Sequence, residues 1–169
     1  NDTKTWIGIA PFAAHQSKMY PLELMEEVIK ALSKNFKIML FGGKNDAEYL
    51  HTLENQNVSI IAGKLSLDEE LDLISNLDVM LSMDSGNVHM ASMLGIKVLT
   101  LWGVTHPYAG FFPFDQDKNN ALLADRTKYP KIPTSVYGNK FPEGYDRSME
   151  TIRPKDVIVF TIRFAKCYT

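Results

Sequence analysis

Residues 78–95 have the sequence DVMLSMDSGNVHMASMLG, and this stretch decides the fold class of the chain. Its first part, residues 78–83, is predicted to form a strand. The turn Asp84-Ser85-Gly86 follows at once. A helix is predicted from there to Leu94, where Gly95 would close it in the left-handed conformation. A strand that passes through a short polar turn into a helix is half of a strand–helix–strand unit, so a parallel sheet is expected.

The same order of elements recurs on both sides of this stretch. Strands are predicted at residues 6–10, 36–41, 58–62 and 97–102, and helices at residues 22–33, about 46–54, and after Ser66. Crossovers of this kind are right-handed and place helices against the sheet. The expected fold class is therefore α/β, with a Rossmann-like parallel sheet that carries helices on both faces.

The helix after Ser66 has the clearest start signal in the chain. Ser66 and Glu69 form the pattern of a capping box, in which the serine oxygen accepts the N–H three residues on and the glutamate reaches back. Leu67, Leu71 and Ile74 are predicted to form the core stripe of this helix.

The regular pattern of apolar residues is lost after the fifth predicted strand. Residues from about 107 to 150 carry Pro, Gly, Tyr and Phe without a period, apart from one short strand predicted at 121–124. Long irregular segments of this kind are usually functional or pack against another part of the protein. A last helix is predicted at about 154–166, with apolar side chains on one face at Val157, Phe160, Thr161 and Phe164. The α/β core is expected to span residues from about 5 to 125.

Composition excludes several function classes. The 169 residues are 45% hydrophobic and 22% charged, which excludes a disordered chain. The net charge of -2 provides no general field for nucleic acid, so an anion must be bound locally. Cys167 is the only cysteine and is expected to be inert, and the four histidines have no metal-ligand spacing. No apolar run approaches the ~20 residues that span a bilayer. The chain begins at Asn1 without a methionine and soon enters a strand, which suggests a part of a larger protein.

The candidate site lies where the strands end, because ligands of parallel sheets bind beyond the carboxyl ends of the strands. In Asp84-Ser85-Gly86 the free N–H groups of a helix start form an anion site, and Gly86 lets a phosphate approach the backbone. The Ser85 hydroxyl can donate to a phosphate oxygen, Asp84 can accept from a sugar hydroxyl, and His89 follows near the same edge. The plainer alternative is an ordinary serine N-cap followed by a buried histidine.

Other loops at this edge carry weaker signals. Lys18 precedes the first helix and is a natural phosphate partner, although a solvated loop lysine is the plainer alternative. Gly42-Gly43 lacks the last glycine of a dinucleotide fingerprint and suits a plain turn equally well. Asp46 and Glu48 are either helix-start charges or ribose ligands, and Thr105 follows the fifth strand.

Residues 82–98 resemble the donor-site motif of glycosyltransferase family 9, the ADP-heptose:lipopolysaccharide heptosyltransferases, which runs roughly D-[ST]-G-P-M-H-x-A-A-x-L-G. Residues 101–107, LWGVTHP, resemble the G-x-T loop that follows it. Residues 7–11 with 17–21, the pair Gly42-Gly43 and residues 62–67 resemble three further blocks of the family in the correct order. The match covers residues from about 6 to 107.

The resemblance implies the C-terminal, nucleotide-sugar-binding half of a two-domain GT-B enzyme. Residues 1–169 would be this donor domain, and the N-terminal acceptor domain, which carries the presumed catalytic base, would be absent. No catalytic residue is therefore expected in this chain, and the fragment alone is expected to be inactive. The implied reaction is transfer of a heptose-like sugar, with inversion, from a nucleotide diphosphate sugar to a lipopolysaccharide-type glycan.

The resemblance also implies roles for the candidate residues and the surroundings of the enzyme. Lys18 would neutralise the diphosphate, and Asp84, Ser85, Gly86 and His89 would hold the phosphates and the sugar. The Gly43 loop, with Asp46, Glu48 and Thr105, would lie near the nucleoside. No metal or other cofactor is expected. The implied partners are an ADP-heptose-like donor and, through the missing domain, a glycolipid acceptor. The implied location is the cytoplasm, with peripheral association of the full-length protein at the inner face of the membrane.

The sequence departs from the family pattern at three places. Asn87 and Val88 replace the usual Pro-Met, and His106 stands where an aspartate is common. The segment of residues 130–140 lacks the paired cysteines of some relatives. These departures leave the identity of the transferred sugar open.

Two rival functions are consistent with the same sheet. One is a non-catalytic nucleotide-binding or regulatory module, and the other is a nicotinamide-dependent oxidoreductase. The second lacks a complete glycine fingerprint after its first strand. The feature that favours a donor site is the convergence of Lys18 with Asp84, Ser85, Gly86 and His89 on one edge, which a packing domain does not need.

Overall fold

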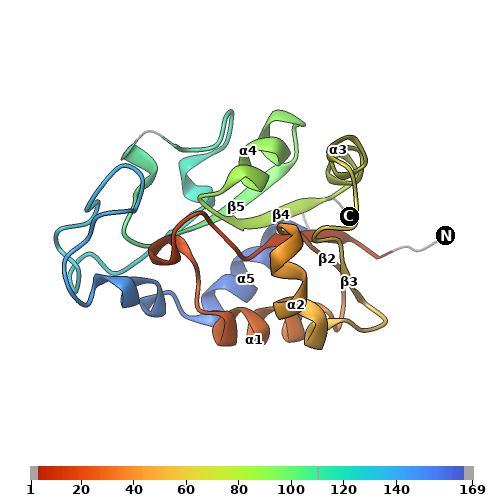
Figure 1. The fold of residues 1–169 in the computed structure, drawn as a ribbon, viewed down its shortest axis with the longest axis horizontal. Helices are drawn as coiled ribbons and strands as arrows, with labels where there is room; N and C mark the ends of the chain where they lie inside the picture. Colours follow the sequence, from red (N-terminus) through yellow and green to blue (C-terminus); the bar gives the residue numbers. More distant parts are fainter. Residues whose placement is uncertain (1–3, 110, 166–169) are drawn as a thin grey trace.

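Continuous apolar runs build a six-stranded parallel sheet at the centre of the chain (Figure 1). The computed structural model describes residues 4–109 and 111–165. The strands lie in the order β3-β2-β1-β4-β5-β6. Their bounds are β1 Trp6–Ala10, β2 Lys37–Leu40, β3 Val58–Ile60, β4 Val79–Met83, β5 Lys97–Trp102 and β6 Ala121–Leu123. The chain runs outward from β1 to β3 and then returns to β4, so the strand order reverses between β1 and β4. Such a switch point is where parallel sheets bind ligands.

Helices cover both faces of the sheet, as predicted. In Figure 1 the helices α3 and α4 lie above the sheet, and α1, α2 and α5 lie below it. Their bounds are α1 Leu22–Leu32, α2 Ala47–Leu50, α3 Leu67–Ser75, α4 Gly86–Met93 and α5 Pro154–Ala165. Strand β4 shows the alternation that this layering requires, because Val79, Leu81 and Met83 join the core with α1 and α5. Met80 joins the core with α3 and α4.

The predicted elements are confirmed with boundary shifts at most of them. The strand expected at 97–102 is unchanged, and Gly95 has φ +78 after α4, as a left-handed cap requires. In the capping box, the Ser66 N–H donates to Glu69 Oε2 over 2.8 Å, and this backbone hydrogen bond lowers the pKa of Glu69. The last helix extends to Ala165, and its predicted end at residue 166 lies outside the described residues.

Two predictions about helices are confirmed only in part. The helix expected at about 46–54 is present as a helical stretch, but only α2 is α-helical in it, between 3-10 turns at Lys44–Asp46 and His51–Leu53. Only Leu50 and Leu53 of these turns are buried, and their spacing of three residues suits 3-10 geometry. In α3, Leu67 is 61% exposed, because a side chain at the first helical position projects over the turn before the helix. The buried face of α3 is formed around Ile74 with Leu73 beside it.

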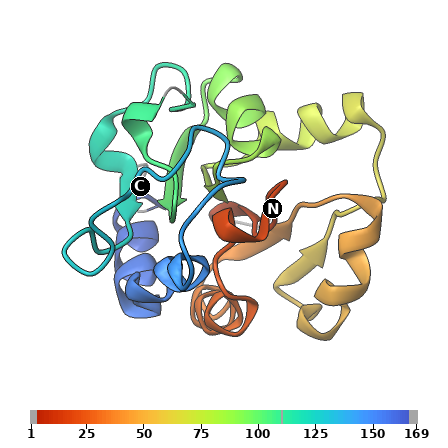
Figure 2. The same cartoon turned by 60° about the vertical axis from the view of Figure 1, so that its left-hand side comes forward.

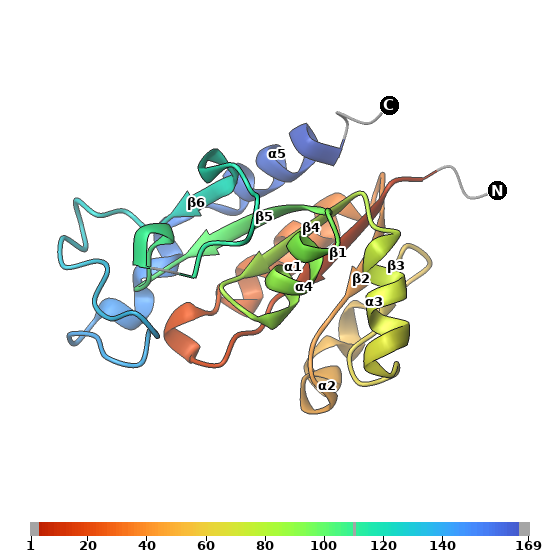
Figure 3. The same ribbon diagram turned by 90° about the horizontal axis from the view of Figure 1, so that it is seen from above.

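The irregular segment after β5 packs back onto its own chain. Figure 3 places β6 at the edge of the sheet beside β5. The segment that follows passes beside the turn after β1, and Figure 2 shows this approach at the carboxyl edge of the sheet. Met149 and Ile152, near the end of the segment, join the core beneath the sheet. Part of the segment without periodicity therefore lies at the carboxyl edge of the sheet, close to the turn after β1.

Within the described ranges, no helix has both the length and the apolar character needed to cross a lipid bilayer.

Candidate functional site

Two adjoining cavities lie at the carboxyl edge of the sheet, beside the switch point between β1 and β4. The first, the Lys18 cavity, has a volume of about 280 Å³ and is lined by Ala14, Lys18, Asp84, Ser85, Gly86, His89, Phe111 and Tyr137. The second, the Gly43 cavity, has a volume of about 480 Å³ and is lined by Ala10, Phe12, Ala13, Gln16, Met19, Leu22, Phe41, Gly42, Gly43, Asp46, Tyr49 and Asn87. Ala13 and Ala14, like Gly86 and Asn87, are chain neighbours that line different cavities, so the two spaces share a wall.

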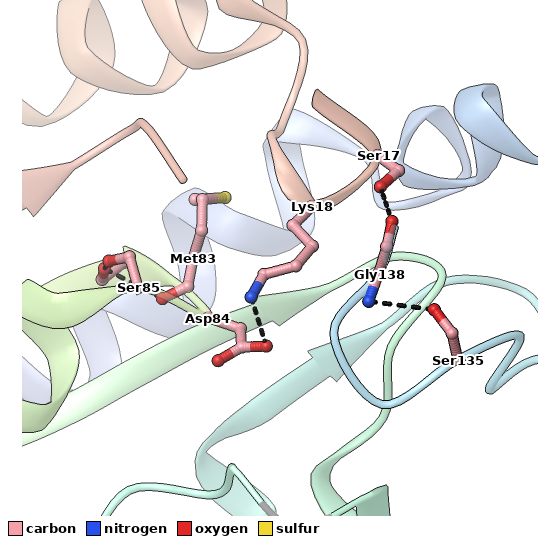
Figure 4. Close-up of polar contacts among 8 residues, drawn as sticks. Ser17, Lys18, Met83, Asp84, Ser85, Ser135 and Gly138 are labelled. Atoms are coloured by element: carbon pink, nitrogen blue, oxygen red, sulfur yellow. Dashed lines mark hydrogen bonds and ion pairs between the residues drawn. The ribbon is translucent and has the colours of Figure 1, made fainter. Parts of the chain in front are cut away.

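Lys18 and Asp84, which both line the Lys18 cavity, form an ion pair (Figure 4). Lys18 Nζ lies 2.8 Å from Asp84 Oδ2, and the two side chains are only 11% and 5% exposed. Each residue follows one of the two central strands, so the parallel pairing of β1 with β4 brings them together. Asp84 Oδ2 receives no hydrogen bond within the described part of the chain, so this contact is one of charge. The alternative of a solvated loop lysine is wrong.

The start of α4 is open to the Lys18 cavity. Ser85 is the N-cap residue by backbone conformation, but its side chain makes no capping hydrogen bond. Its Oγ lies 3.0 Å from Ser82 Oγ instead. A Cβ built on Gly86 would meet nothing within 4 Å, so the first N–H groups of the helix are accessible to a ligand. His89 is half-buried and lines the cavity. The plainer alternative is therefore confirmed only in part, because Ser85 takes the N-cap position without a side-chain cap and His89 is not fully buried.

The Gly43 cavity is mostly apolar and has one carboxylate in its wall. Asp46 Oδ2 accepts a hydrogen bond of 2.7 Å from the Gly43 N–H, so the residue caps its own 3-10 turn while lining the cavity. The rings of Phe12 and Tyr49 stand 6.5 Å apart with a tilt of 53°. A flat aromatic ligand suits walls of this kind.

Two predicted site residues line neither cavity. Glu48 is exposed on the outside of α2. Thr105 is buried, and its methyl group lies 3.2 Å from the position of a Cβ on Gly138. Its Oγ1 has no hydrogen-bond partner in the described part of the chain. The structure thus brings together Lys18, Asp84, Ser85, Gly86 and His89, with Gly43 and Asp46 next door, and leaves Glu48 and Thr105 outside.

Several site residues were not predicted from sequence. Phe111 and Tyr137 form an aromatic wall of the Lys18 cavity, with ring centroids 5.6 Å apart. They belong to the irregular segment, whose path no periodic signal indicates. Asn87, one of the departures from the family motif, donates through Nδ2 to Glu70 Oε1 over 3.0 Å and so links α4 to α3.

His106, the second departure, is a buried packing residue. Its Nδ1 accepts a hydrogen bond of 3.2 Å from the Tyr108 N–H, and the two rings stack at 4.9 Å. Burial, with a smaller contribution from Arg126, lowers the pKa of His106 below its usual value, which keeps the ring neutral near pH 7.

No group of three or more His, Cys, Asp or Glu side chains in residues 4–109 and 111–165 is arranged to hold a metal ion. Cys167 lies outside the residues that the structure describes.

Comparison with known proteins identifies relatives of this arrangement. The model of glycosyltransferase family 9 (heptosyltransferase) matches residues 1–140. The chain is 28% identical over 156 residues to lipopolysaccharide heptosyltransferase 1 of Campylobacter coli, covering 86% of this chain and 42% of the relative. It thus spans less than half the length of this relative.

Solved structures share the fold. A glycosyltransferase family 9 protein of Veillonella parvula superposes with a TM-score of 0.75 at 21% identity, over 98% of this chain and 47% of that one. An Escherichia coli heptosyltransferase with ADP gives a TM-score of 0.68 at 18% identity, over 97% of this chain and 45% of that one. The predicted α/β fold, of the kind found in GT-B heptosyltransferases, is confirmed by these likenesses.

Proposed function

The chain belongs to glycosyltransferase family 9, and we propose that its two cavities bind the donor, a nucleoside diphosphate sugar of the ADP-heptose type. The observation that carries this proposal is the Lys18 cavity, in which an ammonium group and the open start of α4 face the same space. An amine cation together with free N–H groups at a helix start is a site suited to phosphate.

The phosphates would lie between Lys18 and the first turn of α4. The N–H groups after Ser85 point to the cavity with the positive end of the helix dipole, and the Ser85 hydroxyl can turn from Ser82 to a phosphate oxygen. The ammonium group and the helix start are the electropositive groups that would face the diphosphate, and the proposed donor site is metal-independent.

The sugar would lie on the side of Asp84, His89 and the aromatic wall of Phe111 and Tyr137. Asp84 neutralises Lys18, and a carboxylate in this position would repel a phosphate oxygen. Its free lone pairs are better matched to the hydroxyl groups of a sugar. We therefore propose that Asp84 both orients Lys18 and accepts from the sugar.

The nucleoside would occupy the Gly43 cavity. Its walls offer the rings of Phe12 and Tyr49 to a base, and the exposed Gly43 loop with Asp46 to a ribose. The Escherichia coli relative was solved with ADP, which supports adenine as the base. Glu48 has no part in this proposal because it does not line the cavity.

In the proposed reaction an acceptor hydroxyl oxygen attacks the anomeric carbon and forms the new glycosidic bond. The bond from the anomeric carbon to the diphosphate oxygen breaks, and the diphosphate leaves with the electron pair. Lys18 and the start of α4 stabilise the charge that grows on the diphosphate in the transition state. The base that takes the hydroxyl proton is not assigned to any residue of this chain, and we expect no turnover by the 169 residues alone.

The heptosyltransferase relatives point to a lipopolysaccharide-type glycan as the acceptor. We propose a cytoplasmic protein that meets such a glycolipid at the inner face of the membrane. Both statements rest on the family and not on the cavities.

Calorimetric titration with ADP, ADP-heptose and UDP-GlcNAc tests the donor site. We expect ADP and ADP-heptose to bind and UDP-GlcNAc to bind more weakly. A folded chain that binds none of the three would contradict the proposal. Binding of ADP that excludes ADP-heptose would favour a regulatory nucleotide-binding module instead.

A further inference from the structure

Lys18 is confined by a turn that lies 120 residues further along the chain. The Ser17 hydroxyl donates a hydrogen bond to the Gly138 carbonyl, and the Gly138 N–H donates to Ser135 Oγ over 3.0 Å. Ser135 Oγ also accepts from the Lys140 N–H over 3.3 Å. Figure 4 shows the contacts of Gly138 with Ser17 and Ser135 beside the Lys18 side chain. We refer to residues 135–140 as the return turn.

Gly138 lies against the aliphatic part of Lys18. A Cβ built on Gly138 would stand 2.7 Å from both Cγ and Cδ of Lys18, well inside contact distance. Gly138 also has φ +76, a conformation that other residues adopt only with strain. Because Gly138 has no side chain, the methylene groups of Lys18 can pass directly over its backbone. We call this passage the channel.

The channel decides where the ammonium group lies. A lysine side chain has four rotatable bonds and loses considerable entropy when it is fixed. At Lys18 this freedom is already restricted, because the return turn covers its stem and Asp84 holds its end at 2.8 Å. Binding of a ligand to an ammonium group that is already oriented therefore loses less side-chain entropy.

We propose that Gly138 is a positioning residue for the donor site: its lack of a side chain holds the Lys18 stem in the channel that aims the ammonium group at Asp84 and the phosphates. This inference rests on the proposed function for the identity of the ligand. It adds to that function a residue far along the chain that touches no part of the donor and acts only through Lys18.

The test is Gly138→Ala, with Gly144→Ala as the matched control. Gly144 has φ +80, so alanine suffers the same left-handed conformation there, but its Cβ would meet nothing within 4 Å. We expect Gly138→Ala to weaken ADP binding by about tenfold and adenosine binding hardly at all. Gly144→Ala should leave both dissociation constants unchanged.

A double-mutant cycle separates positioning from general disruption. In a Lys18→Ala background the new methyl group has no lysine stem to displace, so Gly138→Ala should cause no further loss of ADP affinity. An equal loss in both backgrounds would overturn the proposal, because the turn would then act on the site without Lys18.

Two further measurements keep the test decisive. If Gly138→Ala does not fold, Ser17→Ala removes the tether of the return turn without adding strain, and we expect it to weaken ADP binding selectively by about threefold. If the unaltered chain binds no ADP, the proposed function fails, but positioning is still tested by NMR of the unliganded chain. The Lys18 Cε signal should then shift in Gly138→Ala and not in Gly144→Ala; an unchanged signal in both would overturn the proposal.

Discussion

The Gly43 cavity and the Lys18 cavity share a wall but are assembled in different ways. Among the described residues, the lining of the Gly43 cavity comes from residues 10–49 with the addition of Asn87. The Lys18 cavity draws on four separate segments, at 14–18, 84–89, Phe111 and Tyr137. The Gly43 cavity is built almost entirely from one local stretch of chain, and the Lys18 cavity contains an ion pair and is closed by long-range contacts. This difference agrees with the proposal that the Gly43 cavity binds the base and the Lys18 cavity binds the phosphates and the sugar.

Lys18→Ala should give the largest effect and separate the two cavities most clearly. Loss of a charged hydrogen-bond partner should weaken ADP binding by about tenfold to a hundredfold. Adenosine, which would use only the Gly43 cavity, should bind as before. Calorimetry with the two ligands measures the contrast. Lys30→Ala is the control, because that side chain is 70% exposed on α1. An equal loss for both ligands would remove the distinction between the cavities.

Phe12→Ala should give the opposite pattern. Phe12 lines only the Gly43 cavity, and loss of its ring should weaken adenosine and ADP alike by about tenfold. Inorganic pyrophosphate, titrated as a probe of the Lys18 cavity, should bind the variant and the unaltered chain equally. A selective loss of pyrophosphate binding would show that the phosphates bind in the Gly43 cavity and would contradict the proposal.

Tyr20→Phe tests how much a long-range hydrogen bond contributes to the stability of the fold. The buried Tyr20 hydroxyl donates to the Ile152 carbonyl over 2.6 Å, and burial is the main reason that the pKa of Tyr20 is raised. Removing the hydroxyl leaves a buried carbonyl without its donor and should cost about 1–2 kcal/mol of unfolding free energy, measured in urea. Asp46→Ala, which removes a local hydrogen bond at the Gly43 loop, should cost less. A larger loss of unfolding free energy in Asp46→Ala than in Tyr20→Phe would contradict the contrast between local and long-range contacts.

The smallest effect is expected from pH, through the buried His106. The folded state lowers the pKa of His106, so below the ordinary value of 6.5 the unfolded chain takes up a proton before the folded chain does. Stability should therefore fall as pH drops from 6.5 towards the lowered pKa. His106→Asn, which keeps an acceptor for the Tyr108 N–H, should flatten the curve in this range. Thermal unfolding at several pH values measures it, and an unchanged curve would exclude His106 as the cause.

The parts that the sequence predicted well are those with local signals. The strands follow from continuous apolar runs, and the start of α3 follows from Ser66 and Glu69. The convergence of Lys18 with Asp84 follows from parallel topology, because residues that end neighbouring strands meet at one edge. These inferences need only periodicity, turn chemistry and the handedness of crossovers.

The parts that it missed depend on contacts between distant segments. Nothing local indicates that Tyr137 and Gly138 return to Lys18, since the return turn has no period and Ser17 and Lys18 lie more than a hundred residues away. The prediction that Glu48 and Thr105 belong to the site is not supported by the cavity linings, for a related reason. Each stands close in sequence to a loop at the correct edge, but the direction of a single side chain is set by packing and not by the order of elements.

The hydrogen bonds from Ser17 to Gly138 and from Tyr20 to Ile152 join residues separated by 121 and 132 positions. Contacts across such long loops form late, because the chain must lose the entropy of closing the loop before the contact stabilises it. We therefore expect the Gly43 cavity to exist earlier in folding than the Lys18 cavity. Pulse-labelling hydrogen exchange would show protection at β1 and β2 before protection at Gly138. Simultaneous protection would refute this order. In a newly made chain, recognition of the phosphates would thus be the last property acquired, and binding of ADP would report that folding has finished.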